Sequence, residues 1–207
     1  MLDRWRALVA RVAESPGHDS ARAVFHDLYA RYTAADRRYH DIHHIDDCLQ
    51  LFDTVRALAL QPDAIEFAIW FHDAIYDSRK SDNEASSASL ADSALAQLGV
   101  PRATRQSVCD LIIATQHNAP PADPDAALLV DIDLSILGQP ATKFDAYEAG
   151  VRFEYAWVTD SAFRAGRSKV LQSFLDRTRI YTTNYFSAAF ESAARQNLNR
   201  SLANLSG

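Results

Sequence analysis

Apolar residues recur at three- and four-residue spacing along most of this chain, and this pattern constrains the fold more than any other feature. One such series consists of Ile45, Cys48, Leu49, Phe52, Val55 and Leu58. Residues at this spacing share one face of an α-helix. The strict alternation of strands is missing, and so are the Asn-Gly and Asp-Gly turns of hairpins. We therefore predict an all-α fold without a sheet.

Proline and glycine residues divide this helical pattern into segments. We expect Ser81 or Asp82 to cap a helix that stops at Gly99. Further helices are expected around residues 141–158, 161–178 and 183–204. No repeat, low-complexity tract or long linker interrupts the chain, so we predict a single domain over residues 1–207 with about eight to ten helices.

Composition limits the class of partner. The chain has 21 basic and 27 acidic residues, a net charge of −6, which argues against a basic surface for nucleic acid. A small phosphorylated substrate remains compatible, because it needs only a local positive site or a metal. No apolar run approaches the roughly 18 residues that span a bilayer, and the N-terminus lacks the apolar block of a secretory signal. We expect a cytoplasmic protein with no membrane partner; its oligomeric state, homodimer included, stays open.

Three short segments place ionisable residues next to apolar helical sequence. His72 and Asp73 directly follow the apolar run that ends at Phe71. Burial of such a pair is costly unless it has a partner or a metal. The segment from His40 to His44 holds three histidines, and on a helix His40 and His44 would share a face that His43 borders. Imidazole is the commonest side-chain ligand of transition metals.

The third segment contains two aspartates, Asp131 and Asp133, within an apolar helix. Residues two apart on a helix point to nearly opposite sides, so we expect only one of them to coordinate an ion. A helix cap or a buried salt bridge is the alternative role. Mixed imidazole and carboxylate ligands suit Mn, Mg, Fe, Co, Ni or Zn in an open site.

The order His…His-Asp…Asp on a helical scaffold resembles the HD-domain superfamily of metal-dependent phosphohydrolases. The nearest resemblance is to its predicted metal-dependent phosphohydrolases of uncharacterised substrate, and it extends over residues 25–200. The segments that carry it are Tyr39 to Ile45, Trp70 to Asp77, Asp82 to Glu84, Asp131 to Gly138, Arg179 to Tyr181 and Glu191 to Leu198. The resemblance implies a single helical HD domain that binds one or two divalent ions.

The resemblance also implies roles for individual residues. The pattern Tyr39-His40-x-x-x-His44 is similar to a segment of cyclic-nucleotide phosphodiesterases, in which the second histidine binds metal and the first is the general acid. By that similarity His44 is a ligand and His40 protonates the leaving oxygen. Asp133-Leu134-Ser135 resembles the ligand segment of the same enzymes, which favours Asp133 over Asp131. The implied metal ligands are His44, His72, Asp73 and Asp133.

Four further residues are candidates around the ion. Asp77 lies four residues after Asp73 and occupies the aspartate position of a superfamily motif, so it is the candidate base that orients water. His117, Glu84 and Arg152 are candidates for binding substrate phosphate, and His117 for a second metal. Each of the three also has a purely structural alternative, such as a helix cap or a solvated face.

We therefore expect an enzyme that hydrolyses a phosphomonoester, phosphodiester or anhydride in a nucleotide or another small phosphorylated metabolite. Two alternatives remain. One is a di-iron oxygenase with the same fold, for which only His43 and His117 are spare histidines. The other is a non-catalytic, metal-stabilised module that binds a ligand.

Overall fold

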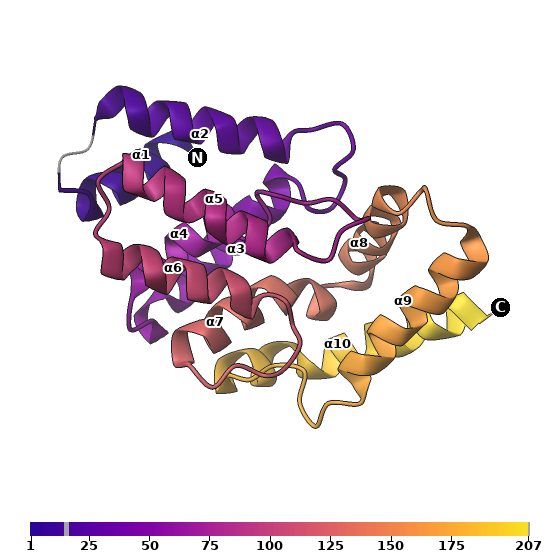
Figure 1. Cartoon of the computed structure of the whole chain (residues 1–207). Coiled ribbons are helices and arrows are strands. Elements are labelled where there is room, and N and C mark those ends of the chain that lie inside the picture. Colours follow the sequence, from indigo (N-terminus) through magenta and orange to yellow (C-terminus); the bar gives the residue numbers. More distant parts are fainter. Residues whose placement is uncertain (15–16, 207) are drawn as a thin grey trace. The chain divides into compact units, whose positions relative to one another are not determined.

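The computed structural model describes residues 1–14 and 17–206. Over these residues the chain forms ten α-helices and two 3₁₀ helices and contains no strand (Figure 1). The prediction of an all-α fold with eight to ten helices is thus confirmed. The chain divides into two compact units, Met1–Val130 and Asp131–Gly207. The single domain over residues 1–207 stays a prediction.

The first unit is built around the short helix α4 (Pro62–Phe71), which packs against four other helices. Every residue of α4 from Ala64 to Phe71 is buried. Pro62 stands in the first turn, where a missing backbone N–H costs nothing. The surrounding elements are α1 (Leu2–Val12), α2 (His18–Tyr32), α3 (Ile42–Val55), η1 (Arg56–Leu58), α5 (Asn83–Gln97), α6 (Arg102–Ala114) and most of α7 (Pro124–Asp133).

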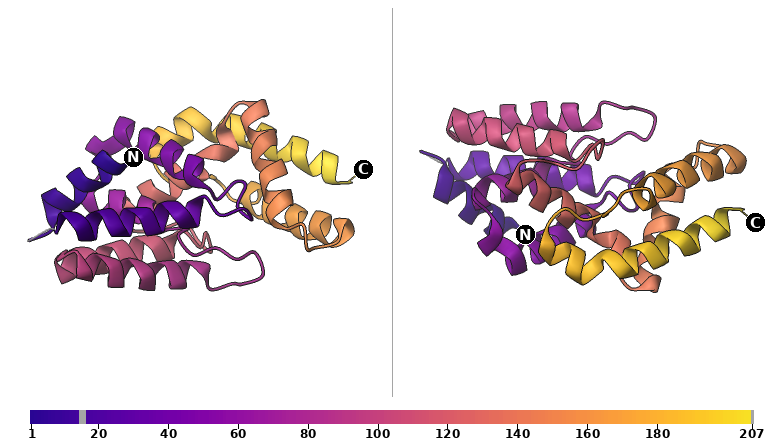
Figure 2. Two further views of the ribbon diagram at one scale, coloured as in Figure 1. Left: turned by 90° about the horizontal axis from the view of Figure 1, so that it is seen from above. Right: turned by 90° about the horizontal axis from the view of Figure 1, so that it is seen from below.

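Helices α5 and α6 form a helical hairpin on this core, and both views in Figure 2 show them side by side. Asp82 takes the N-cap position of α5, although its side chain makes no capping hydrogen bond. Gly99 has a φ of 76°. Glycine adopts this left-handed conformation without steric cost, and it ends the helix at the predicted place.

A buried carboxylate on α4 is paired with arginines. Glu66 on α4 is 2% exposed. It accepts hydrogen bonds from Arg4 at 2.8 Å, Arg11 at 3.1 Å and Arg56 at 2.6 Å. A carboxylate buried this deeply needs such partners, so Glu66 has a structural explanation that requires no ion.

The second unit consists of η2 (Leu134–Gly138), α8 (Ala141–Glu154), α9 (Asp160–Leu175) and α10 (Asn184–Ser206). The three helices expected around residues 141–158, 161–178 and 183–204 are therefore present. Helix α10 packs on η2 and α9. Gly138 lets it approach closely, because a Cβ at Gly138 would lie 2.7 Å from the Cβ of Phe190. None of the described helices combines the length and the apolar character needed to cross a bilayer.

Candidate metal centre

Two histidine side chains face each other in the core of the first unit. His44 is on the first turn of α3, and His72 caps the C-terminal end of α4. Their exposed fractions are only 6% and 2%. The Nε2 atoms of the two rings lie 3.1 Å apart. The sequence predicted both as ligands, and their side chains converge from segments that are 28 residues apart.

The hydrogen bond that Nδ1 of His72 makes determines which of the two ring nitrogens carries the proton. Nδ1 lies 2.9 Å from the carbonyl oxygen of Ile69. A carbonyl only accepts hydrogen bonds, so Nδ1 carries the proton and donates it. In the neutral ring, Nε2 then presents its lone pair toward His44. A ring nitrogen tied to a backbone carbonyl is the usual arrangement of a histidine that binds a metal through the other nitrogen.

Asp73 completes a cluster of three donor atoms. Its Oδ2 lies 3.2 Å from Nε2 of His72 and 3.6 Å from Nε2 of His44. Ligand atoms about 2.1 Å from an ion lie about 3.0 Å apart at neighbouring octahedral positions and about 3.4 Å apart in a tetrahedron. The three separations of 3.1, 3.2 and 3.6 Å match these edges. The His-Asp cluster could therefore hold a metal ion.

The start of α3 differs from the expectation for the histidine segment. His40 and His44 were predicted on one helix face, but α3 begins at Ile42 and His40 precedes it. The reason is Asp41, whose carboxylate accepts hydrogen bonds from the backbone N–H groups of His43 and His44 at 2.8 and 3.2 Å. This N-cap satisfies first-turn donors and starts the helix after His40.

His40 nevertheless lies next to the cluster. Its ring centroid is 6.3 Å from that of His44. The ring stacks on Tyr76 with a centroid distance of 4.0 Å and an interplanar angle of 25°. His40 is half-buried, whereas His43 is exposed. These positions are compatible with the predicted general acid at His40, a role that stays a prediction.

Asp131 is fully buried and is occupied by backbone contacts within the second unit. Its carboxylate accepts hydrogen bonds from the N–H groups of Thr182 and Thr183 at 2.9 and 2.7 Å, and from the Thr183 hydroxyl at 2.7 Å. Burial raises the pKa of the Asp131 carboxyl, against the hydrogen bonds, which lower it. Asp131 thus anchors the start of α10. Asp133 is half-exposed at the end of α7, and its role as a ligand stays a prediction.

Asp77 and Glu84 lie on the connection into α5 and in its first turn. Helix α4 ends at Phe71, so Asp77 does not share a helix face with Asp73. Instead, its carboxylate accepts a hydrogen bond from the N–H of Arg79 at 2.9 Å, and its own N–H donates to the side chain of Asn83 at 3.0 Å. Glu84 is half-buried in the first turn of α5, which is a favourable place for a carboxylate.

His117 follows the end of α6 at Ala114, so it lies in the turn after the helix. Its φ is 55°, a left-handed conformation that a non-glycine residue adopts rarely. His117 is half-buried. Its role in binding phosphate or a second metal stays a prediction.

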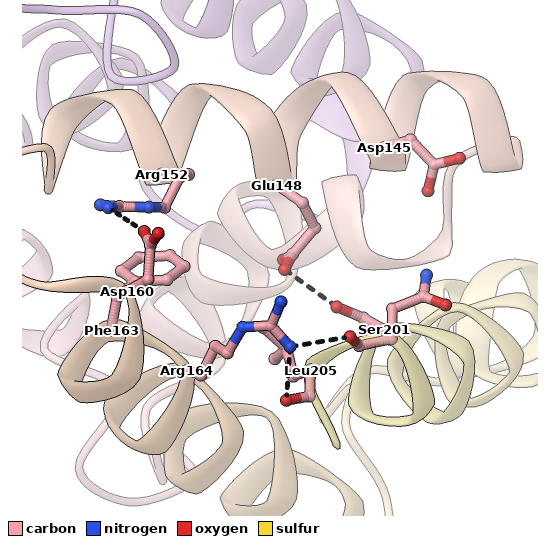
Figure 3. Close-up of a pocket in the computed structure, with 9 residues that line it drawn as sticks. Asp145, Glu148, Arg152, Asp160, Phe163, Arg164, Ser201 and Leu205 are labelled. Atoms are coloured by element: carbon pink, nitrogen blue, oxygen red, sulfur yellow. Dashed lines mark hydrogen bonds and ion pairs between the residues drawn. The ribbon is translucent and has the colours of Figure 1, made fainter. Parts of the chain in front are cut away.

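The guanidinium of Arg152 is engaged within the second unit. It donates to the carbonyls of Tyr155 and Val158 at 2.8 and 3.2 Å and to the Asp160 carboxylate at 2.6 Å. Figure 3 shows the Arg152 side chain aimed at Asp160, in a groove of about 430 Å³. It also lies 4.7 Å from the ring centroid of Phe163. These contacts hold the turn between α8 and α9 and give Arg152 a structural role. Its role in binding substrate phosphate stays a prediction.

Arg37 lies near the cluster and was not predicted from the sequence. Arg37, between α2 and α3, donates to the backbone carbonyls of Asp73 and Ala74 and to that of His40. Its only sequence signal is its place just before Tyr39-His40. Two of the partners, Asp73 and Ala74, lie 36 and 37 residues away, and carbonyl acceptors have no signature in a sequence.

Comparison with known proteins adds no assignment. No protein-family model, curated protein or solved structure matches the chain. The resemblance to the HD superfamily therefore rests on the residues named above.

Proposed function

We propose that this protein is a metal-dependent phosphohydrolase of the HD type. The observation that carries the proposal is the convergence of His44, His72 and Asp73. Their three donor atoms lie within 3.6 Å of one another, and two of them belong to deeply buried imidazoles. Because Nδ1 of His72 is hydrogen-bonded to the carbonyl of Ile69, Nε2 is the nitrogen that faces this point. The order of these residues along the chain supports the resemblance to the superfamily.

Asp133 is the fourth ligand in this proposal. The resemblance implies this role, because Asp133-Leu134-Ser135 is similar to the ligand segment of the cyclic-nucleotide phosphodiesterases. Asp131 supports the assignment indirectly, since its oxygens already accept three hydrogen bonds. Two imidazoles and two carboxylates form a mixed donor set that suits Mn, Fe, Co, Ni, Zn or Mg. Four protein ligands leave room at a six-coordinate ion for water and substrate.

The chain would supply proton transfer and positioning around the ion. A bound divalent cation would lower the pKa of a coordinated water and polarise a phosphoryl oxygen. His40 would donate a proton to the leaving oxygen, and its stacking on Tyr76 limits the orientations of its ring. Asp77 would orient the attacking water. The substrate would be a nucleotide or another small phosphorylated metabolite.

The proposal is tested by a screen of phosphomonoesters, phosphodiesters and nucleoside phosphates with Mn²⁺, Mg²⁺, Ni²⁺ and Co²⁺. We expect turnover by the wild type with at least one ion and loss of turnover in Asp73→Ala. The control is Asp27→Ala, which removes an exposed carboxylate whose ion-pair partner among the described residues is Arg31 on α2. Its activity should equal that of the wild type.

Two results would contradict the proposal. One is metal bound by the wild type without turnover of any phosphorylated compound, which would favour the ligand-binding alternative. The other is iron in the purified protein with a mixed-valence spectroscopic signal, which would favour the oxygenase.

A further inference from the structure

Arg37 connects the two chain segments that carry the cluster. Its Nη1 lies 3.0 Å from the carbonyl oxygen of His40 and 2.6 Å from that of Asp73. Its Nη2 lies 3.1 Å from the carbonyl oxygen of Ala74. One half-buried guanidinium thus binds the backbone of the predicted general acid and the backbone of a predicted ligand.

Two aromatic rings lie next to the guanidinium of Arg37. Its central carbon lies 5.2 Å from the ring centroid of Tyr32 and 5.7 Å from that of Tyr76. Both distances are within the range of a cation–π interaction. Tyr76 also stacks on His40. Arg37, Tyr76 and His40 therefore form one continuous set of contacts beside the cluster.

The position of Asp73 makes such a contact necessary. Helix α4 ends at Phe71, so the carbonyls of Asp73 and Ala74 lie beyond the last helical turn, where the helix supplies no donor. Arginine offers several donors in a rigid planar fork, whereas lysine offers a single flexible ammonium group. The fork of Arg37 therefore fixes the backbone from which the Asp73 carboxylate projects.

We infer that Arg37 is a positioning residue of the metal centre: it holds the backbone of the proposed ligand Asp73 against the chain segment that leads from His40 to the proposed ligand His44. This inference rests on the proposed metal centre. Arg37 would not touch the ion; it would act through the backbone of Asp73, a proposed ligand, and of His40, the proposed general acid. Partners behind metal ligands typically change metal affinity by about 10–100-fold when they are removed.

The second unit contains a matched control. Arg195 on α10 also binds three backbone carbonyls, those of Leu175 at 3.1 Å, Arg177 at 2.8 Å and Thr178 at 3.1 Å. It is half-buried, like Arg37. Its carbonyl partners belong to the end of α9 and the following turn, which contain no predicted ligand. The two arginines share a structural task, and only Arg37 is expected to affect metal binding.

The experiment measures Mn²⁺ affinity by calorimetric titration and stability by urea unfolding in metal-free buffer. We expect Arg37→Met to raise the Mn²⁺ dissociation constant by about 10–100-fold. Arg37→Lys should recover only part of the affinity, because it keeps the charge and loses the fork. Arg195→Met should bind Mn²⁺ like the wild type, even though it loses stability.

Equal Mn²⁺ affinity in the wild type and Arg37→Met would overturn the positioning role and leave the metal centre intact. The same weakening in Arg195→Met would overturn it as well, since the effect would then follow stability alone. If Arg37→Met does not fold, Arg37→Gln, which keeps two side-chain donors, replaces it, and wild-type affinity in that variant would count against the role. A wild type that binds no ion would contradict the metal centre itself, and the positioning role with it.

Discussion

In the second unit the buried carboxylate of Asp131 meets three hydrogen-bond donors, whereas in the first unit the buried imidazoles of His44 and His72 meet each other. Both arrangements place ionisable groups in an apolar interior, where they need compensation. In the second unit the compensation comes from backbone N–H groups of the segment before α10. In the first unit, donor atoms with lone pairs converge on one point, and a cation is the partner that suits them.

The same contrast holds for other polar residues of the second unit. Glu191 accepts hydrogen bonds from the N–H groups of Ile180 and Tyr181 and from Arg195. The buried side chain of Asn197 donates to the carbonyls of Leu137 and Gln139. Burial of a polar group is therefore a weak sign of function in this protein. Convergence of several potential ligands distinguishes the candidate site.

Removal of the His72 side chain should have the largest effect of these changes. If it has no effect on metal binding, the contrast between the buried groups of the two units is wrong. At an Mn²⁺ concentration about 1,000 times the dissociation constant, the ion should stabilise the folded wild type by about 4 kcal/mol. His72→Ala should lose this stabilisation because it lacks one of the converging nitrogens. Urea unfolding with and without Mn²⁺ measures the difference. Equal stabilisation of wild type and variant would remove His72 from the site.

Asp131→Ala tests the structural side of the comparison. The change leaves the N–H groups of Thr182 and Thr183 without their acceptor, so we expect a loss of about 3 kcal/mol in the free energy of unfolding. Asp145→Ala is the control, because the partner of this exposed carboxylate within the described part of the chain is Arg200, and such a surface pair should contribute less than about 1 kcal/mol. Similar losses in the two variants would show that Asp131 does not anchor α10.

Gly138→Ala tests how tightly η2 and α10 pack. The added Cβ would lie 2.7 Å from the Cβ of Phe190 and 2.8 Å from its carbonyl oxygen, so we expect destabilisation by about 1–3 kcal/mol. The control is Gly166→Ala in α9, where a Cβ meets nothing within 4 Å. That change should stabilise the helix by up to about 1 kcal/mol. Thermal unfolding of both variants measures the two changes in stability. If Gly138→Ala is as stable as the wild type, the packing of α10 on η2 is not as close as described.

Cys48→Ala should have the smallest effect. The Sγ atom of Cys48 lies 3.8 Å from Nδ1 of His44, a longer and weaker contact than the carbonyl of Ile69 makes with His72. We expect Mn²⁺ affinity to fall by less than about 10-fold. A larger loss, measured by the same titration, would mean that sulfur binds the ion directly.

The helices were predictable because apolar periodicity and glycine or proline stops are local signals. The ends of the helices near the site were less so. The N-cap Asp41 has a recognisable residue type, but three nearby histidines favoured a helix that already included His40. Neither the three contacts of Asp131 nor the contacts of Arg37 with the carbonyls of Asp73 and Ala74 could be predicted, since their partners lie 51 to 52 and 36 to 37 residues away along the chain.

The most direct test of the metal centre is anomalous diffraction from a crystal of the wild-type protein grown with Mn²⁺. We predict one strong peak about 2.0–2.3 Å from Nε2 of His44, from Nε2 of His72 and from carboxylate oxygens of Asp73 and Asp133. A crystal with Mn²⁺ bound elsewhere, or with the two Nε2 atoms still in contact and no peak beside them, would contradict the account.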